Sequence, residues 1–321
     1  MRIGIIGTGG IAHNHLGALQ SIPSASVVAV TDIARERAAW LLDATGADFA
    51  ADVADLAGRV DAAYVLTPPR ARVEAISALA ANKVAIFCEK PLAASVAQAE
   101  QIASIVHAAG IPFMMGFMRR WHPPYAQLRS VINSGVIGEP IYFHRTRVGL
   151  LEQNPGNWRT DPAQLCGVTM ESASHDLDLL RWLGGDIATM RGEAVQSRPE
   201  LPGFDESVVA TGRFASGAAV ALQVSWRSRI ARNDVGVIGT HGAALITGDA
   251  LWSSDRLCVA TTSESYDVQF TEADATNDGY GAQAQAFIKL AEGHDIDHAG
   301  VDDGLATVRL SQQILDSATL T

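Results

Sequence analysis

A turn of six residues near the start of the chain has the composition of a phosphate-binding loop. Its residues are Gly7, Thr8, Gly9, Gly10, Ile11 and Ala12. Gly7 permits a tight turn after a short apolar run, and Gly9 lets the backbone approach a pyrophosphate without a Cβ in the way. The phosphates would meet the N-terminus of the expected next helix, where N–H groups and the dipole favour negative charge. A ligand-free strand–helix turn would also contain glycines, so the turn needs a second observation beside it.

That second observation is Asp32, which lies twenty residues past Ala12 at the end of the next expected strand. A carboxylate there can accept hydrogen bonds from an adenosine ribose and would repel a 2′-phosphate. The turn and the carboxylate together predict a dinucleotide site that prefers NAD. Arg35 and Arg37 follow closely and leave NADP open as a cofactor.

A lysine in the tripeptide Glu89-Lys90-Pro91 follows a later expected strand. In an open parallel sheet, that end of the strand faces the ligand crevice. Lys90 could hydrogen-bond a substrate hydroxyl and stabilise alkoxide character as a hydride leaves. Glu89 could hold the lysine in place, and a cis peptide bond before Pro91 would aim it. A surface ion pair followed by a turn proline explains the same tripeptide, so both interpretations stay open here.

Four useful side chains share one face if the chain is helical from residue 170 onward. Glu171, His175, Asp178 and Trp182 are spaced by four, three and four residues. A histidine, with an unperturbed pKa of about 6.5, suits proton removal from a hydroxyl at neutral pH. Glu171 could orient His175 or contact the substrate. A histidine that is merely hydrogen-bonded is the alternative, and a metal pair is disfavoured because no further ligands follow at short spacing.

The other histidines and the cysteines predict neither a metal site nor a disulfide framework. His13 and His15 lie beside the glycine turn and are expected only to line the first helix. The cysteines are widely separated, odd in number and without a CxxC pair, so we expect reduced packing residues. Structural or surface positions are expected for the following: Cys88, Cys166, Cys258, His122, His144, His294 and His298.

The composition of the 321 residues excludes several classes of partner. The 35 carboxylates outnumber the 24 lysines and arginines and repel phosphate backbones and anionic membranes, which argues against nucleic acid. No apolar stretch approaches the roughly 20 residues that a membrane span needs. The first apolar run meets glycines at once, unlike a signal peptide. We therefore expect a soluble, cytoplasmic protein.

The scaffold expected for residues 1–118 is a doubly wound α/β domain of the dinucleotide-binding (Rossmann) kind. Short apolar runs alternate with Ala-rich helical patterns such as 71–81 and 96–109. Such alternation indicates right-handed crossovers and a parallel sheet covered on both faces. The expected strands are residues 2–6, 26–31, 62–66, 84–88 and 112–116.

Residues 119–321 predict a second, α+β domain. Apolar and polar residues alternate at 206–214, 218–228 and 234–238, which indicates a large, mostly antiparallel open sheet. Helices are expected at 124–133, 280–292 and 302–317. An open sheet needs its exposed face covered, so we expect a homodimer or homotetramer.

Taken together and in order, the motifs resemble the glucose–fructose oxidoreductase / inositol dehydrogenase (Gfo/Idh/MocA) family. The matching segments span most of the chain, and the ordered set is far more specific than any one motif. They are IIGTGGIA at 5–12, TPP at 67–69, CEKPL at 88–92, GFMRR at 116–120, IGEP at 137–140, WRTDP at 158–162, SHDLDLLRW at 174–182 and GTHG at 239–242. The resemblance implies a Rossmann domain, a substrate domain on an open sheet, and hydride transfer at a ring carbon that bears a hydroxyl.

The resemblance also implies roles for individual residues. Lys90 would be the polarising lysine and His175 the general acid/base, with Glu171 one turn before it. The nicotinamide would lie over the strand ends, near Thr67, Pro68, Glu89 and Lys90. The run at 116–120 is most similar to inositol dehydrogenases, so cyclic polyols and pyranoses lead as substrates. The implied substrate-facing residues are Lys90, Arg119, Asn157, Trp158, Glu171 and His175.

Several positions depart from the family pattern. Glu171 stands where Asp is usual, and its longer reach bears on substrate specificity more than on the chemistry. Arg70 and Arg72 stand where Asn or Ser and a His are usual. Solvated arginines at a helix start are favoured there over contacts to a cofactor phosphate or an acidic substrate. Cys166 replaces a common glycine, which would narrow the pocket.

The sequence therefore predicts a metal-free, NAD-dependent dehydrogenase of a cyclic polyol or aldopyranose. One alternative is a redox-neutral sugar-converting enzyme that retains its NAD. Another is a catalytically silent sugar sensor that keeps the dinucleotide fold for binding. The presence of both Lys90 and His175 argues against a sensor, which needs neither.

Overall fold

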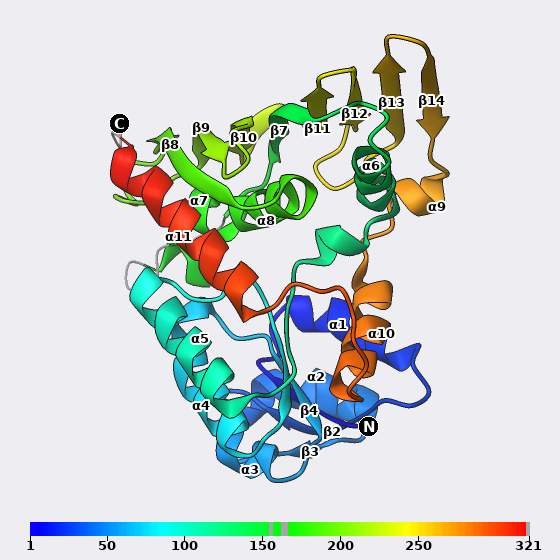
Figure 1. Cartoon of the computed structure of the whole chain (residues 1–321). Helices are drawn as coiled ribbons and strands as arrows, with labels where there is room; N and C mark the ends of the chain where they lie inside the picture. The colour runs from blue at the N-terminus through cyan, green and yellow to red at the C-terminus, as the bar shows by residue number, and fades with distance from the viewer. Residues whose placement is uncertain (154–156, 162–165, 319–321) are drawn as a thin grey trace. The chain divides into compact units, whose positions relative to one another are not determined.

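The computed structural model describes residues 1–153, 157–161 and 166–318, so Pro162 of the WRTDP motif lies outside the described residues. The chain divides into two compact units (Figure 1). The first unit comprises Met1–Met118 and Tyr280–Val308, and the second comprises Arg119–Gly279 and Arg309–Thr321. Within the described ranges, no helix is both long and apolar enough to cross a membrane.

The first unit is built on a six-stranded sheet with the order β3-β2-β1-β4-β5-β6. All of its pairings are parallel. This order reverses direction between β1 and β4, which opens a crevice at the carboxyl ends of the strands. It confirms the predicted Rossmann fold class. The strands are β1 (Arg2–Ile6), β2 (Ser26–Thr31), β3 (Asp48–Phe49), β4 (Ala62–Val65), β5 (Ala85–Cys88) and β6 (Phe113–Met115).

Helices connect these strands and cover the sheet. Every residue of β4 and β5 is buried, as expected for central strands with helices on both faces. The two-residue strand β3 is too short to leave a readable pattern, and the sequence did not predict it. The helices are α1 (Ile11–Gln20), α2 (Arg35–Thr45), α3 (Val53–Ala57), the 3-10 turn η1 (Pro69–Ala71), α4 (Arg72–Ala81) and α5 (Val96–Ala109).

Part of the C-terminal chain returns to the first unit. Helix α10 (Tyr280–Ala291) and the beginning of α11 (Val301–Ser317) belong to it. Tyr280 packs edge-on against His15, and Phe287 packs edge-on against Tyr64. The first crossing between units falls at the predicted boundary of 118/119, whereas the predicted second domain also contained residues 280–308. An amphipathic pattern shows that a helix has an apolar face but not which core receives it.

The second unit contains an eight-stranded sheet with the order β14-β13-β12-β11-β7-β10-β9-β8. The pair of β7 with β10 is parallel, and the other recorded pairings are antiparallel. The mostly antiparallel sheet confirms the predicted class of this unit. Its strands are β7 (Pro140–Leu150), β8 (Ile187–Val195), β9 (Ser207–Phe214), β10 (Ala219–Ser225), β11 (Arg227–Gly239), β12 (Gly242–Thr247), β13 (Arg256–Thr261) and β14 (Ser265–Gln269).

Helices pack on one face of this sheet (Figure 1). Strand β9 shows the resulting asymmetry, since Val208 and Ala210 are buried whereas Val209 and Thr211 are exposed. The core of the unit lies between the sheet and its helices and includes Trp226 and Phe214. The helices are α6 (Pro123–Asn133), α7 (Val168–Glu171), α8 (Ala173–Gly184), α9 (Glu272–Ala275) and the C-terminal part of α11, with 3-10 turns η2 (Met118–Trp121) and η3 (Trp158–Thr160).

Candidate active site

The glycine turn joins β1 to α1, and the space beside its backbone at Gly9 and Gly10 is free of neighbouring atoms among the described residues. Gly7 has φ +91°, and a Cβ there would lie 3.1 Å from the backbone of Leu66 and Thr67, so a side chain would be both strained and crowded. A Cβ at Gly9 or Gly10 would meet nothing within 4 Å. Helix α1 has no side-chain cap and no acidic residue in its first turn. Its N-terminus therefore offers backbone N–H groups and positive dipole charge to a phosphate, and the turn fits a dinucleotide.

Asp32 follows the end of β2, directly beside this turn. Its Oδ2 accepts hydrogen bonds from the backbone N–H and the hydroxyl of Thr8, both at 2.7 Å. Its Oδ1 accepts from the N–H of Ile33 at 2.7 Å and lies 3.4 Å from Nε of Arg37. The sequence prediction that Asp32 and the turn form one site thus has a direct geometric basis. Arg37 is 60% exposed at the side chain, so it reaches the carboxylate from solvent.

Lys90 follows β5, and its peptide bond to Pro91 is cis. The carboxylate of Glu89 sits behind it: Oε2 accepts from the N–H of Lys90 at 2.9 Å, and Oε1 lies 2.9 Å from Nε2 of His15. Both Glu89 and His15 are buried. Burial opposes ionisation of Glu89, but the hydrogen bond and charge of His15, with Lys90 and Arg72, outweigh it and hold the pKa of Glu89 below its usual value.

These contacts bear on the roles expected for Glu89 and His15. Glu89 holds the backbone of Lys90, which was one of its two expected roles, and its expected contact with the cofactor stays a prediction. His15 was expected only to line the first helix, and it instead contributes the partner of Glu89. The sequence feature that could have indicated its burial is its place on the apolar face of α1, with Ala12, Leu16 and Leu19. A histidine one turn from a glycine-rich loop suggests burial but does not identify its partner.

Arg72 was expected to be a solvated arginine at a helix start, and this expectation was wrong. Its side chain is buried, with 2% of the residue exposed. The guanidinium hydrogen-bonds the carbonyl oxygens of Thr67, Glu89 and Pro91. The neighbouring Arg70 remains exposed, as predicted for both.

In the second unit, Glu171 ends α7 and forms an ion pair with Arg159. Nη2 of Arg159 donates to Oε1 of Glu171 at 2.6 Å, and the guanidinium lies 4.6 Å from the ring of Trp158. Asn157 caps the turn η3 by accepting from the N–H of Arg159 at 3.1 Å. Arg159 thus connects Asn157, Trp158 and Glu171, three residues that the sequence assigned to the site.

His175 lies one helical turn beyond Glu171. The helix is interrupted at Ser172, but that residue keeps right-handed helical angles (φ −89°, ψ −46°). The rise from Glu171 to His175 is therefore about 6 Å, as in a continuous helix. His175 is buried, with 4% exposed, and its N–H donates to the carbonyl of Ser172 at 3.2 Å. The predicted spacing of the carboxylate and the imidazole is thus retained.

Other residues of the predicted helical face have structural partners instead. Asp178 forms a buried two-point ion pair with Arg120, at 2.6 and 3.0 Å. The guanidinium of Arg129 lies over the ring of Trp182 at 4.3 Å. These contacts show that Asp178 and Trp182, which follow His175 in α8, have structural partners within the second unit. The catalytic face suggested by the sequence is therefore shorter than the periodic pattern.

Asp176, which faces away from that pattern, is the centre of a buried cluster with two arginines of β7. Nε of Arg145 donates to Oδ1 at 2.7 Å, and Nη2 of Arg147 donates to Oδ2 at 2.6 Å. Burial opposes ionisation, but Arg147 and Arg145 outweigh it and lower the pKa of Asp176 to about 2. The cluster is a structural tie between α8 and β7.

Arg119 borders this cluster. Its guanidinium lies 5.0 Å from the ring of Trp252 and 5.8 Å from that of Tyr125, and it is 3% exposed. Burial, partly offset by Tyr125, lowers the pKa of Arg119 to about 10. The predicted contact between Arg119 and the substrate stays a prediction, and its described partners are aromatic rings and the carbonyl of Trp252.

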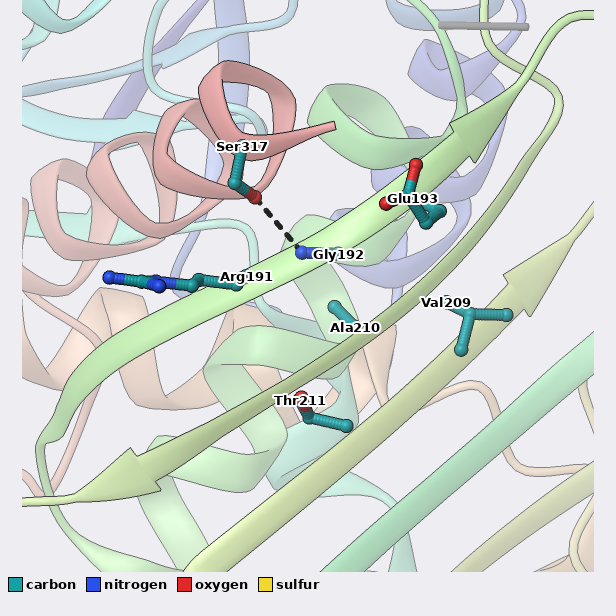
Figure 2. Close-up of a pocket in the computed structure, with 7 residues that line it drawn as sticks. All are labelled: Arg191, Gly192, Glu193, Val209, Ala210, Thr211 and Ser317. Carbon is teal, nitrogen blue, oxygen red and sulfur yellow. Dashed lines mark hydrogen bonds between the residues drawn. The ribbon is translucent and has the colours of Figure 1, made fainter. Parts of the chain in front are cut away.

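An open hollow of about 490 Å³ lies in the second unit and is lined by none of these groups. Figure 2 shows its lining from β8, β9 and the end of α11, where the backbone N–H of Gly192 donates to the hydroxyl oxygen of Ser317 at 3.0 Å. None of its lining residues is a predicted site residue. Its single cation and single carboxylate, Arg191 and Glu193, give it no catalytic constellation.

The predicted residues thus fall into two sets. The glycine turn, Asp32, Thr67, Pro68 and Lys90 belong to the first unit, whereas Asn157, Trp158, Glu171 and His175 belong to the second. Among the described residues, no group of three or more His, Cys, Asp or Glu could hold a metal ion.

Comparison with known proteins agrees with this division. Residues 1–117 match the oxidoreductase family with an NAD-binding Rossmann fold, and residues 125–245 match the GFO/IDH/MocA C-terminal domain. The chain is 34% identical over 191 residues to Inositol 2-dehydrogenase 3 of Saccharopolyspora erythraea, a match that covers 58% of this chain and 54% of that relative. It is 33% identical over 233 residues to Inositol 2-dehydrogenase of Acidothermus cellulolyticus, covering 70% and 66%.

Among solved structures, levoglucosan dehydrogenase in complex with NADH and levoglucosan superposes with a TM-score of 0.87. The match covers 99% of this chain and 96% of that one at 22% identity, and it concerns the fold. The matched part of the first curated relative is about half of its length. From the two family matches and the architecture that carries them, the chain belongs to the Gfo/Idh/MocA oxidoreductase family, and its first unit is an NAD-binding Rossmann domain.

Proposed function

We propose that the protein is an NAD-dependent dehydrogenase that oxidises a ring hydroxyl of a cyclic polyol or an aldopyranose. The observation that carries this proposal is the support built behind Lys90. Buried Glu89 and Arg72 hold the backbone around one lysine at the carboxyl edge of the NAD-binding sheet, and buried His15 holds Glu89. Binding a dinucleotide does not require such a lysine, whereas its cation would stabilise the charge on a reacting hydroxyl.

NAD is favoured over NADP by Asp32. A carboxylate at the end of β2 suits the two ribose hydroxyls of NAD and repels a 2′-phosphate. Thr8 donates two hydrogen bonds to Asp32, which fixes its Oδ2 beside the glycine turn. Arg37 partly balances this charge from solvent, so weaker use of NADP is compatible with the site. Thr67 and Pro68, after β4, are the further residues that we assign to the nicotinamide end.

The chemistry divides between the two sets of residues. His175 takes the proton of the reacting hydroxyl, and the Lys90 ammonium stabilises the negative charge that develops on the oxygen. When bound, NAD accepts the hydride that leaves the same carbon. Glu171, held by Arg159 at 2.6 Å, keeps its carboxylate one turn from the imidazole. The proposal requires that Lys90 and His175 reach one hydroxyl.

Polyols and sugars lead as substrates for two reasons. The curated relatives are named inositol 2-dehydrogenases, and a solved relative was crystallised with levoglucosan. Asn157, Arg159 and Glu171 also offer donors and acceptors suited to several adjacent hydroxyls. Glu171 extends farther than the Asp usual in the family, so we propose a substrate specificity different from that of myo-inositol enzymes.

The test is turnover of a panel of inositols, aldoses and sugar acids with NAD or NADP, followed by the absorbance of the reduced nicotinamide. We expect NAD reduction with one stereochemical group of cyclic polyols or pyranoses. A flat trace across the panel, with NADH binding intact, would contradict the proposal. Tightly bound NAD in the purified protein, together with conversion of a sugar without added NAD, would support the redox-neutral alternative instead.

The exposed face of the second unit's sheet supports self-association. Its apolar side chains include Val209 and Val195, which are 55% and 45% exposed. These apolar side chains leave water when a second copy covers this face of the sheet. We propose a homodimer or homotetramer assembled through this face.

A further inference from the structure

Arg72 occupies an unusual place for an arginine, since it lies buried behind the strand ends of the first unit. Its Nε and Nη2 donate to the carbonyl oxygen of Thr67 at 3.1 and 2.8 Å. Its Nη1 donates to the carbonyl oxygens of Glu89 and Pro91, and Nη2 reaches that of Lys90 at 3.4 Å. One guanidinium thus contacts the segment after β4 and three consecutive carbonyls after β5.

These hydrogen bonds lie on both sides of Lys90 along the backbone. The peptide groups before and after its Cα are both held by Arg72, while its own N–H is held by Glu89 at 2.9 Å. The direction in which a side chain leaves the backbone depends on these two peptide planes. Arg72 therefore restrains the origin of the Lys90 side chain through the backbone.

The contacts of Arg72 are to backbone oxygens rather than to carboxylates. The oxygens that it hydrogen-bonds are the carbonyls of Thr67, Glu89, Lys90 and Pro91, and it also interacts with the buried thiol of Cys88. A rigid guanidinium fork can satisfy several separated carbonyls at fixed angles, whereas the three donors of an ammonium share one nitrogen. The site is thus built for a planar, multidentate donor.

We infer that Arg72 is the positioning residue for Lys90, fixing both the lysine and the Thr67 segment at the nicotinamide edge. The inference rests on the proposed function, because positioning matters only if Lys90 acts on substrate. A small misplacement of a catalytic group lowers the rate of the chemical step by up to about 100-fold.

The test compares Arg72→Met with Arg70→Met, using the substrate that the panel identifies. Arg70 lies two residues earlier, carries the same charge and is exposed. For Arg72→Met we expect kcat to fall about 10- to 100-fold, with NADH affinity changed less than about threefold. The primary deuterium isotope effect on kcat should rise, because the chemical step becomes slower. Arg70→Met should keep kcat within about twofold of wild type.

A double-mutant cycle separates positioning from a general structural role. If Arg72 acts through Lys90, Arg72→Met should have little further effect on kcat in a Lys90→Met background. An equal loss in both backgrounds, with an unchanged isotope effect, would overturn the inference. It would mean that Arg72→Met only reduces the folded fraction.

Arg72→Lys keeps the test decisive if Arg72→Met does not fold. It retains the charge but carries its donors on a single nitrogen, so we expect a soluble protein with reduced kcat and a raised isotope effect. Wild-type kcat in Arg72→Lys would overturn the inference. If the wild-type protein turned over no substrate of the panel, the proposed function would fail instead. Failure of the proposed function and failure of the positioning role are therefore distinguishable.

Discussion

The backbone around Lys90 is held by more hydrogen bonds than the local sequence predicts. Its N–H bonds Glu89, and the carbonyls around it bond Arg72. These contacts restrain the backbone from which the side chain leaves, which supports the role that we propose for Lys90 at the reacting oxygen.

Replacing Lys90 with Met should lower kcat by about 10²- to 10³-fold, because the developing negative charge loses its cation. The affinity for NADH, measured by fluorescence titration, should change little. Lys289→Met, at an exposed position of α10, is the matched control and should behave as wild type. Wild-type turnover in Lys90→Met would show that the ammonium has no part in the reaction.

Replacing His175 with Asn should lower kcat by about 10²- to 10⁴-fold, because the hydroxyl proton loses its acceptor. Steady-state kinetics with saturating NAD would measure this. Glu171→Gln should act more mildly and mainly raise KM, since it weakens the ion pair with Arg159 but leaves the imidazole in place. If His175→Asn changed only KM, the histidine would bind substrate rather than accept its proton.

The sequence identified the residues with catalytic potential more readily than those that hold them. Lys90, Glu171 and His175 stand out by type and spacing. Arg72 and His15 do not, because a charged residue in sequence is expected at the surface and its burial depends on partners far along the chain. Arg72 reaches residues up to 19 positions away, and His15 reaches Glu89, 74 positions away.

Among the elements, β7 and α8 are joined by ion pairs inside the second unit. Asp176 of α8 bonds Arg145 and Arg147 of β7, all three at most 1% exposed. Removing one partner of a buried pair leaves an uncompensated charge, which costs several kcal/mol. Asp176 is therefore the charged partner that compensates both buried arginines of β7, beside the hydrogen bonds of Arg147 to Ser172.

This carboxylate should make the protein sensitive to acid. Arg147 and Arg145 outweigh burial and lower the pKa of Asp176 to about 2, below the value of about 3.9 in an unfolded chain. Its stabilisation is therefore complete above about pH 4 and is lost as the pH falls through about 2, a change of about 2 kcal/mol. Denaturant titrations of wild type at several pH values would measure it.

Asp176→Asn should remove this part of the pH dependence and lower the free energy of unfolding at neutral pH by about 3 kcal/mol. Asp186→Asn is the control, because Asp186 pairs with Arg181 at the surface and is 77% exposed at the side chain. That pair should contribute no more than about 1 kcal/mol. Equal stability losses in the two variants would contradict the structural role of Asp176.

The same ion pairs explain which strands could be predicted. Strands β9 and β10 alternate cleanly, and residues 206–214 and 218–228 predicted them closely. Strand β7 was not predicted, because Arg145 and Arg147 occupy its buried face where apolar side chains are expected. Two core arginines convert an alternating pattern into one that resembles a polar loop.

At the scale of the whole molecule, the first unit is assembled from two distant segments of the chain. Five of the six Rossmann strands were predictable because each is a short apolar run, whereas β3 has only two residues. The return of residues 280–308 was not, because nothing local distinguishes a helix that packs on one core from a helix that packs on another. Only the ring contacts of Tyr280 with His15 and of Phe287 with Tyr64 show that this helix packs on the first unit.

The open face of the second unit leads to a prediction about assembly. Val209→Asp should shift the protein toward monomer, because it places a second carboxylate opposite Glu193 on the face that we expect a second copy to cover. Val209→Thr, which keeps the shape without a charge, should retain the wild-type state. Sedimentation velocity would measure both variants. A wild-type protein that is monomeric at micromolar concentration would contradict the proposed assembly.

An isotope-transfer experiment directly tests whether the protein moves a hydride from a ring carbon of the substrate to NAD. The substrate that gives the fastest turnover in the panel would be deuterated at its ring carbons, and the reduced dinucleotide analysed by mass spectrometry. A dehydrogenase acting as proposed yields NADH that carries one deuterium from the substrate, at a rate that falls sharply in Lys90→Met. Net oxidation of the sugar with unlabelled NADH, or a sugar product that has lost no deuterium after turnover, would contradict the proposed reaction.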